Sequence, residues 1–185
     1  MRATVFRYRY PNKQNTLFLD RDGVLIHPVL RGDHVGSARQ EKDIRMCNDF
    51  EGLNLPDIVK NWNLVIITNQ PDVSYGHIDM VFVERIGDLI STLIPINVMY
   101  VCPHEDKDKC ECRKPNAGMI KQYHNDYPEI IGKEFLVGDT DKDYGCAENA
   151  GIPFILRKRS YNTDLVPFAD YYINTLRGLG DILGK

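Results

Sequence analysis

The sequence predicts an α/β fold built on a doubly wound, mostly parallel sheet. Three observations lead to this prediction: short apolar runs recur along the chain, segments with helical patterns separate them, and several runs end in a polar residue. Runs of this length with β-branched side chains are typical of buried parallel strands. Strands that alternate with helices build such a sheet, and right-handed crossovers bring the strand C-termini to one ligand-binding edge.

Five apolar runs are expected to be strands. In chain order they are TLFLD (16–20), LVIIT (64–68), VMYVC (98–102), EFLVGD (134–139) and PFILR (153–157). The segments with helical patterns are 55–62, 80–93, 117–127 and 143–151. Gly151 lies where a glycine would end the last of these helices, since glycine readily adopts the left-handed conformation of a helix C-cap.

The length fits one domain over residues 1–185, and the hydrophobic fraction of 43% is enough for a core. Residues 1–15 are expected to be a modest N-terminal extension, with an extra strand as one option. The polar, irregular stretch 27–48 is expected to form a flap or hairpin beside the ligand-binding edge. The intervals between the motifs leave no room for a large cap domain.

Charge and hydropathy exclude several functions. The chain has 23 Lys and Arg against 26 Asp and Glu, and its net charge of −3 gives no general attraction for nucleic acid or an anionic membrane. No run approaches the ~18 apolar residues of a membrane span, and the first 15 residues lack the apolar core of a secretory signal. We therefore expect a cytoplasmic protein whose five cysteines are thiols.

Two carboxylates one residue apart, Asp20 and Asp22 in FLDRDGVL, follow the first predicted strand. Like charges at this spacing repel each other unless a cation offsets them. Asp139 ends another predicted strand and would lie at the same edge, and three carboxylates suit Mg²⁺ bound together with a substrate phosphate. Taken alone, DRDG also fits an ordinary turn with an aspartate cap.

A polar triplet follows the second predicted strand. TNQ supplies the hydroxyl of Thr68 and the amides of Asn69 and Gln70, which suit phosphate oxygens. Thr68 alone would fit a strand-end cap equally well. The order of this triplet among the other motifs favours a shared phosphate site.

A pair of cations precedes a predicted helix. Arg113 and Lys114 lie in RKP, with Pro115 as the expected first helical residue, and GDTDKD (138–143) opens a later helix. A lone lysine is more often solvated than catalytic. Four such motifs in order along an alternating chain are much harder to obtain by chance.

A cysteine-rich loop follows the third predicted strand. CPHEDKDKCEC has the spacing C-x-H-x5-C-x-C, with the candidate ligands Cys102, His104, Cys110 and Cys112. Three thiolates and one imidazole form a closed tetrahedral set typical of structural Zn²⁺. Chance thiols or a redox pair are the alternatives. We expect a zinc loop over 102–112. Arg113 and Lys114 follow it directly, so a bound metal would fix the backbone that orients these two cations.

The motifs FLDRDGV, VIITN, CRKP and VGDTDKD together resemble the haloacid-dehalogenase-like phosphatases, in this order and over roughly residues 14 to 157. The resemblance implies that Asp20 is the nucleophile and Asp22 the general acid and base, and that Thr68 and Lys114 hold the transferring phosphoryl group. An acid at position 22 looks like a phosphatase, because the family's dehalogenases lack it and its ion pumps carry threonine there.

The same resemblance assigns the magnesium ligands. It implies that Asp20, Asp139 and the backbone carbonyl of Asp22 bind Mg²⁺ and that Asp143 supports the site. Hydrolysis would pass through an aspartyl phosphate, which divides one displacement into two.

The cysteine loop narrows the resemblance to a capless branch that holds heptose-bisphosphate and histidinol-phosphate phosphatases, both with this loop. TNQPD (68–72) and the tail 161–176 look more like sugar-phosphate members. Two departures stand out: Ser74, Tyr75 and Gly76 replace the usual alanine, arginine and glycine, and the flap lacks a glycine-tyrosine-valine stretch. The resemblance implies that Arg113 helps to recognise the far end of the substrate. Its planar guanidinium can form two parallel hydrogen bonds and would suit a second phosphate there.

The sequence therefore predicts a Mg²⁺-dependent phosphomonoesterase for a small sugar phosphate, with D-glycero-D-manno-heptose 1,7-bisphosphate favoured. The alternatives are histidinol phosphate as substrate and an inactive, zinc-stabilised binding module. A nucleic-acid 3′-phosphatase is disfavoured by the net charge and the lack of a basic stripe. We expect neither a nucleic-acid nor a membrane partner.

Overall fold

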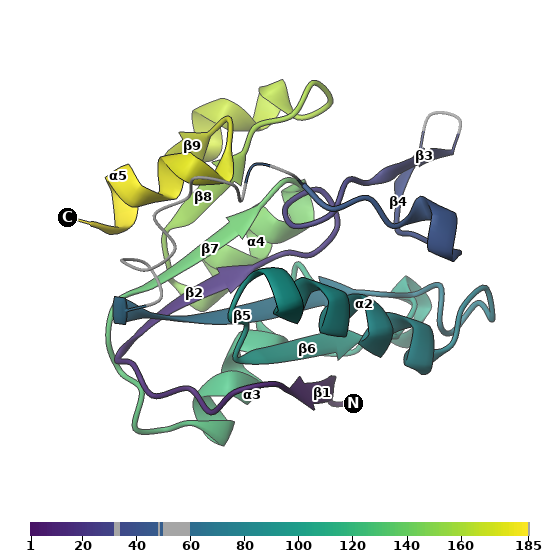
Figure 1. The fold of residues 1–185 in the computed structure, drawn as a ribbon, viewed down its shortest axis with the longest axis horizontal. Helices are drawn as coiled ribbons and strands as arrows, with labels where there is room; N and C mark the ends of the chain where they lie inside the picture. The colour runs from purple at the N-terminus through teal and green to yellow at the C-terminus, as the bar shows by residue number, and fades with distance from the viewer. Residues whose placement is uncertain (32–33, 48, 50–59, 185) are drawn as a thin grey trace.

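The computed structural model describes residues 1–31, 34–47, 49 and 60–184 of the chain. Its centre is a seven-stranded sheet with the order β1-β6-β5-β2-β7-β8-β9 (Figure 1). Every neighbouring pair in this sheet is parallel except β1 and β6. The strands are β1 (Thr4–Arg7), β2 (Asn15–Leu19), β5 (Trp62–Asn69), β6 (Val98–Cys102), β7 (Glu134–Gly138), β8 (Phe154–Arg157) and β9 (Tyr171–Ile173). All five predicted strands and the α/β fold class are confirmed, and the strand in the N-terminal extension is β1.

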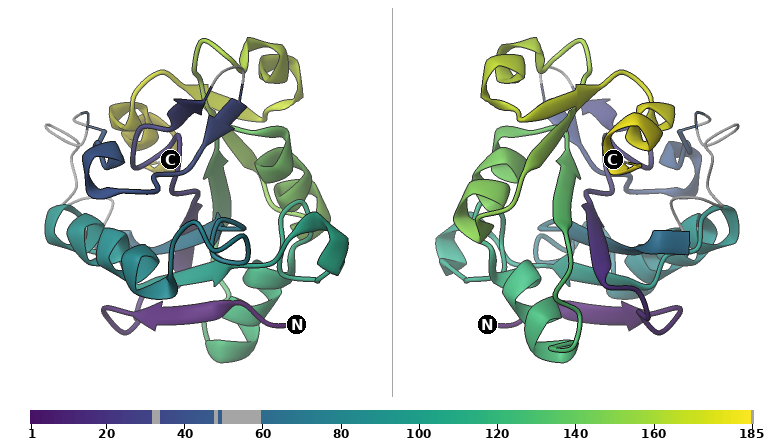
Figure 2. Two further views of the ribbon diagram at one scale, coloured as in Figure 1. Left: turned by 90° about the vertical axis from the view of Figure 1, so that its right-hand side faces the viewer. Right: turned by 90° about the vertical axis from the view of Figure 1, so that its left-hand side faces the viewer.

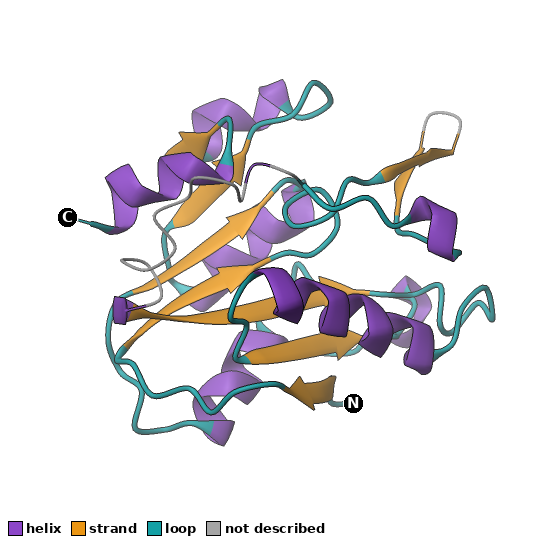
Figure 3. Cartoon of the chain, viewed as in Figure 1, coloured by secondary structure: helices purple, strands orange, loops and turns teal. Residues whose placement is uncertain are grey.

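The helices of the described residues are α2 (Met80–Leu93), α3 (Gly118–Asp126), α4 (Asp141–Ala150) and α5 (Leu179–Leu183), with 3₁₀ turns η1 (Glu41–Asp43), η3 (Asp106–Asp108), η4 (Thr163–Phe168) and η5 (Leu176–Gly178) (Figure 3). Three of the four predicted helices are confirmed as α2, α3 and α4, and Gly151 is the predicted left-handed cap with φ of 70°. The predicted helix at 55–62 lies largely outside the described residues. No helix that the structure describes is long and apolar enough to cross a membrane.

One expectation about α3 is wrong. Pro115 is not its first residue, because the helix begins at Gly118. The amide of Asn116 donates to the Arg113 carbonyl in a turn, and the Gly118 amide donates to the Glu111 carbonyl. An ideal Cβ on Gly118 would lie 2.1 Å from that carbonyl oxygen, so the cysteine loop packs tightly against the start of the helix. The loop therefore keeps residues 113–117 outside the helix.

Alternate side chains of the strands supply a core on each face of the sheet. Leu64 and Ile66 of β5 belong to one apolar cluster, and Val65 and Ile67 to the other. Figure 2 shows the result edge-on, with α2 and α5 on one face and α3 and α4 on the opposite face. Because helices cover both faces, the carboxyl ends of the strands are the expected place for a ligand in a sheet of this kind.

The carboxyl ends of the central parallel strands meet at one edge of the sheet. A hairpin of β3 (Val29–Arg31) and β4 (His34–Gly36) stands beside this edge, apart from the main sheet (Figure 1). This hairpin confirms the flap predicted within 27–48. The cysteine loop extends from the end of β6, so both expected accessories border one rim.

Candidate active site

Asp20 and Asp22 leave the end of β2 on a tight turn. The Asp20 amide continues the strand ladder by donating to the Val137 carbonyl at 2.9 Å. Gly23 then takes φ of +93°, a conformation that favours glycine. An ideal Cβ at Gly23 would lie 2.0 Å from Asp139 Oδ2, so a side chain here would also displace that carboxylate. The glycine of DRDG thus allows the loops after β2 and β7 to touch.

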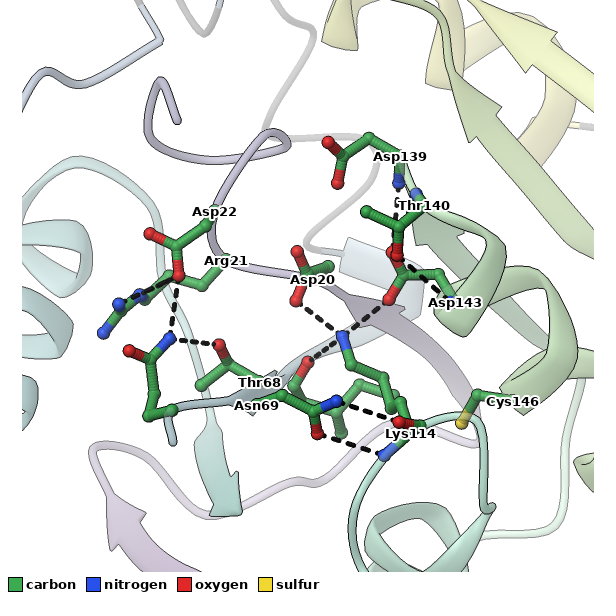
Figure 4. Close-up of polar contacts among 12 residues, drawn as sticks. Asp20, Arg21, Asp22, Thr68, Asn69, Lys114, Asp139, Thr140, Asp143 and Cys146 are labelled. Carbon is green, nitrogen blue, oxygen red and sulfur yellow. Dashed lines mark hydrogen bonds and ion pairs between the residues drawn. The ribbon is translucent and has the colours of Figure 1, made fainter. Parts of the chain in front are cut away.

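Lys114 lies at the centre of the buried acids (Figure 4). Its Nζ atom is 2.6 Å from Asp20 Oδ1, 2.6 Å from Asp143 Oδ1 and 2.9 Å from the Ile67 carbonyl. The side-chain amide of Asn69 accepts from the Lys114 amide and donates to its carbonyl, both at 3.0 Å. This pair of bonds fixes the lysine backbone, which makes Asn69 a support for Lys114.

The carboxylates of Asp20, Asp139 and Asp143 form a buried cluster in which one oxygen of each lies within 4.8 Å of the others. Asp143 is hydrogen-bonded within the protein. Its Oδ2 atom accepts from the amides of Asp139 and Thr140 and from the Thr140 hydroxyl at 2.6 Å. Asp139 Oδ1 is buried without a hydrogen-bond partner in the described part of the chain. Such a group is a candidate metal ligand, since a buried carboxylate oxygen left unpaired is costly.

Burial also perturbs the protonation of these acids. Loss of solvent raises the pKa of Asp20 to about 7, with Lys114 acting in the opposite direction. Burial, and then the neighbouring Asp20 and Asp143 carboxylates, raise the pKa of Asp139 well above its usual range. A second cation beside Lys114 would favour the ionised forms of both acids.

Asp22 is held by a different set of donors. Its Oδ2 atom accepts from Arg21 at 2.9 and 3.1 Å, from the Ser37 hydroxyl at 3.1 Å and from the Gln70 amide at 2.8 Å. Ser37 belongs to the segment after the β3–β4 hairpin, so the flap contacts this aspartate directly. Asp22 Oδ1 makes no hydrogen bond within the described residues. One oxygen is thus fixed by these hydrogen bonds, while the other is buried without a partner in the described part of the chain.

The three polar residues after β5 occupy different positions relative to the cavity. Thr68 and Asn69 line the cavity described below, whereas Gln70 is fully buried and absent from its lining. Gln70 instead bridges Asp22 and the Thr68 hydroxyl, each at 2.8 Å. A contact between substrate and Asn69 or Gln70 stays a prediction, and the geometry gives both amides a supporting position.

A cavity of about 440 Å³ opens above the carboxylates. The strand ends, the flap and the start of α4 line it with Asp20, Asp22, Arg31, Val35, Gly36, Ser37, Arg39, Thr68, Asn69, Pro71, Asp72, Arg113, Lys114, Asp139, Thr140 and Lys142. All the predicted catalytic residues therefore reach one opening. Its walls also carry four further cations, from the flap, the cysteine loop and α4, which suits an anionic ligand.

Arg113 lies between the cysteine loop and the cavity. Its Nε atom is 2.6 Å from Asp106 Oδ1, and Nη1 donates to the His104 carbonyl at 3.2 Å. Asp106 is on the surface, with a side chain that is 77% exposed, whereas Arg113 is 9% exposed. The loop thus orients the guanidinium through Asp106, a partner that sequence reasoning did not identify.

The four predicted loop ligands, Cys102, His104, Cys110 and Cys112, meet in space and could hold a metal ion. The sulfur atoms of the three cysteines are 3.4 to 3.6 Å apart. His104 Nδ1 lies 3.5 Å from Cys102 Sγ and 3.2 Å from Cys112 Sγ. All four side chains therefore point to one centre. Cys47 and Cys146 lie outside this group.

Besides Asp106, sequence reasoning missed four residues that contact Asp22 or Asp139. Arg21 and Ser37 contact Asp22, Tyr161 donates its hydroxyl to Asp139 Oδ2, and Asn162 donates to the Asp139 carbonyl at 2.7 Å. Arg21 had one local signal, its position between the two aspartates. The others are 15 to 23 residues from their partners, so no spacing pattern links them.

The mostly parallel sheet and the buried aspartates around Lys114 at its edge define a phosphatase of the haloacid-dehalogenase-like class. A family model described as polynucleotide kinase 3 phosphatase matches residues 17–161, which is most of the chain. The chain belongs to this family.

Two curated relatives and one solved structure carry more specific names. The chain is 30% identical over 152 residues to a D-glycero-β-D-manno-heptose-1,7-bisphosphate 7-phosphatase of Haemophilus ducreyi, a match that covers 75% of this chain and 80% of that protein. It is 28% identical to the histidine biosynthesis bifunctional protein HisB of Campylobacter jejuni, over 75% of this chain but only 40% of that protein.

The solved structure is a D,D-heptose 1,7-bisphosphate phosphatase from B. bronchiseptica, complexed with magnesium and phosphate. It superimposes with a TM-score of 0.74 at 21% identity and covers 91% of this chain and 97% of that one. At this identity the likeness shows a shared fold.

Proposed function

We propose that this phosphatase hydrolyses a small sugar bisphosphate through an aspartyl phosphate on Asp20, with residues 1–185 acting as one domain in the cytoplasm. The observation that carries the proposal is the buried contact of Lys114 with Asp20 beneath a cavity rich in cations. A carboxylate in line with an incoming phosphorus is a competent nucleophile, and a neighbouring ammonium offsets charge on the phosphoryl oxygens.

Asp22 is suited to proton transfer. Its Oδ2 atom is held by Arg21, Ser37 and Gln70, and its Oδ1 atom is buried without a hydrogen-bond partner in the described residues, in a side chain that lines the cavity. From there it can protonate the leaving alcohol and later take a proton from the water that attacks the aspartyl phosphate. Thr68 lines the cavity and offers a hydroxyl to the transferring group.

The acidic cluster fits Mg²⁺. Asp139 Oδ1 is a buried oxygen without a partner in the described residues, and Asp20 and Asp143 lie within 4.8 Å. Hard carboxylate oxygens combined with substrate phosphate are the usual setting of this ion. We assign Asp20, Asp139 and the Asp22 backbone carbonyl as ligands, with Asp143 holding Lys114 and the α4 N-terminus in place. Bound Mg²⁺ would neutralise negative charge on the phosphoryl group and on Asp20.

The choice of substrate depends on the cavity walls. A bisphosphate brings a second anion, and four cations line the opening beyond the reacting centre: Lys142 together with Arg31, Arg39 and Arg113, and each of these arginines also pairs with an aspartate. Histidinol phosphate instead brings an amine. Asp72, the acid of the lining outside the reacting centre, already pairs with Arg39 at 2.7 and 3.1 Å and with His77 at 2.9 Å. The walls thus favour the bisphosphate named for the Haemophilus relative.

A substrate panel tests this proposal. Phosphate release with Mg²⁺ is compared for D-glycero-D-manno-heptose 1,7-bisphosphate, histidinol phosphate, an aryl phosphate and a 3′-phosphorylated oligonucleotide. The last substrate is included because of the family description. We expect kcat/KM to be highest for the heptose bisphosphate. A higher kcat/KM for histidinol phosphate or for the oligonucleotide would make that compound the substrate instead. Inactivity on all four compounds would favour a binding module.

Arg113→Ala is expected to lower kcat/KM for the bisphosphate by about ten-fold or more and to leave aryl phosphate hydrolysis nearly unchanged. The reason is that only the bisphosphate has a second anion for the guanidinium, and ten-fold corresponds to about 1.4 kcal/mol. Asp106→Asn is the control, since it removes the Arg113 ion pair and keeps the cation. An equal loss on both substrates would mean that Arg113 serves the reacting phosphate or the fold.

We also propose that the cysteine loop binds structural zinc. A tetrahedral site with Zn–S bonds of about 2.3 Å has S···S edges of roughly 3.8 Å and S···N edges of roughly 3.5 Å. The observed separations of 3.2 to 3.6 Å approach these values. The site is closed, so zinc would act by fixing the loop that bears Arg113 and Lys114.

Purified protein is therefore expected to contain about one equivalent of zinc by elemental analysis, independent of the added Mg²⁺. Cys110→Ser should lose the metal, melt at a lower temperature, and show both a higher KM and a lower kcat, because the loop no longer places its cations. Cys146→Ser is the matched control outside the cluster. Zinc-free protein from a chelator-free preparation would refute the site.

A further inference from the structure

The segment after β8 contacts both loops that carry the proposed magnesium ligands. The Tyr161 hydroxyl donates to Asp139 Oδ2, and the Asn162 amide donates to the Asp139 carbonyl at 2.7 Å. Arg159 donates through Nε, at 2.9 Å, and through Nη2 to the Gly23 carbonyl. Tyr161, Asn162 and Arg159 therefore connect β8 to the turn after β2 and to the end of β7.

The segment is itself held in shape. Asn162 is 3% exposed and also donates to the Arg157 carbonyl at 3.0 Å, while its Oδ1 atom accepts from the Arg159 amide at 2.7 Å. These bonds close residues 157–162 into a compact turn. Tyr161 thus reaches Asp139 from a turn that hydrogen bonds tie to Arg157 at the end of β8.

The contact decides which oxygen of Asp139 remains available. Oδ2 accepts from the Tyr161 hydroxyl, whereas Gly23 packs against both oxygens, since an ideal Cβ there would lie 2.0 Å from Oδ2 and 2.6 Å from Oδ1. Oδ1 is buried and without a hydrogen-bond partner in the described residues. A carboxylate held by one oxygen presents the other in a fixed direction, which lowers the cost of ordering it when a cation binds.

We infer that Tyr161 is a positioning residue for the magnesium site, with Arg159 and Asn162 as its supports. This inference rests on the proposed function, because it concerns the affinity of the assigned Mg²⁺ ligands. Partners that orient metal ligands typically contribute 10–100-fold in affinity or activity. Tyr161 lies outside the four motifs, 22 residues after Asp139. The tertiary fold, not a local motif, brings it to the site.

The test compares Tyr161→Phe with Tyr172→Phe, a tyrosine of β9 whose ring faces Lys158 at 5.6 Å rather than the carboxylates. Mg²⁺ binding to the substrate-free enzyme is measured by titration calorimetry, and unfolding is followed by scanning calorimetry. Tyr161 is 38% exposed and Tyr161→Phe keeps the ring, so the fold should persist. We expect the Mg²⁺ dissociation constant of Tyr161→Phe to rise about ten-fold or more. Tyr172→Phe should bind Mg²⁺ as the wild-type protein does, and both variants should unfold at the wild-type temperature.

Two other results overturn the inference. An unchanged dissociation constant would mean that Asp139 is oriented without Tyr161, and tighter Mg²⁺ binding would mean that the hydroxyl competes with the ion. Both leave the proposed function intact, because wild-type protein still binds Mg²⁺. Wild-type protein that binds no Mg²⁺ would instead remove the magnesium site itself, and the role of Tyr161 with it.

Discussion

Asp20→Asn is expected to abolish phosphate release while the protein remains folded. The substitution removes the attacking carboxylate with almost no change in volume. Lys114 keeps its bonds to Asp143 at 2.6 Å and to the Ile67 carbonyl at 2.9 Å, so the buried cation does not lose all its partners. The side-chain oxygen of asparagine can also still accept from Lys114, so the variant should remain folded.

Steady-state phosphate release with saturating Mg²⁺ measures this effect. Trapping of labelled phosphate on the protein at acidic pH then tests the covalent step, since wild-type enzyme should retain label on Asp20 and the variant should not. Asp79→Asn is the matched control, because Asp79 caps α2 at a distance from the cavity and asparagine caps helices equally well. A folded Asp20→Asn protein with most of its activity would rule out the aspartyl phosphate.

Asp22→Asn is expected to leave a slow enzyme, with a loss of roughly 10²–10⁴-fold on a sugar phosphate. The side-chain oxygen of asparagine can still accept from Arg21, Ser37 and Gln70, so the turn should keep its shape. What disappears is the proton carried to the leaving alcohol. An aryl phosphate needs that proton less, and its first half-reaction should suffer less.

The two steps can be separated in time. Rapid-mixing measurements with the aryl phosphate should show a burst of phenol followed by slow turnover, because the later activation of water still requires Asp22. Ser37→Ala is the companion variant, as it removes one donor to Asp22 and leaves the carboxylate. Equal losses on good and poor leaving groups would argue against Asp22 as the acid.

The sequence determined the features that depend on local spacing and burial. Val65, Ile66 and Ile67 identify β5 because a strand covered on both faces needs consecutive apolar side chains. Asp20 and Asp22 share one turn, and the four loop ligands lie within eleven residues, so short-range geometry was enough to group them. The order of the motifs then indicated a single edge, because parallel crossovers align the strand ends.

The tertiary structure alone decided which distant groups meet. It set the strand order that places β7 beside β2 and so brings Asp139 to Asp20. In the folded chain, the Gln70 amide donates to Asp22, α3 begins after Pro115, and the Tyr161 hydroxyl donates to Asp139. These contacts follow from how the layers pack, and packing depends on side chains from the whole chain, so no local pattern encodes them.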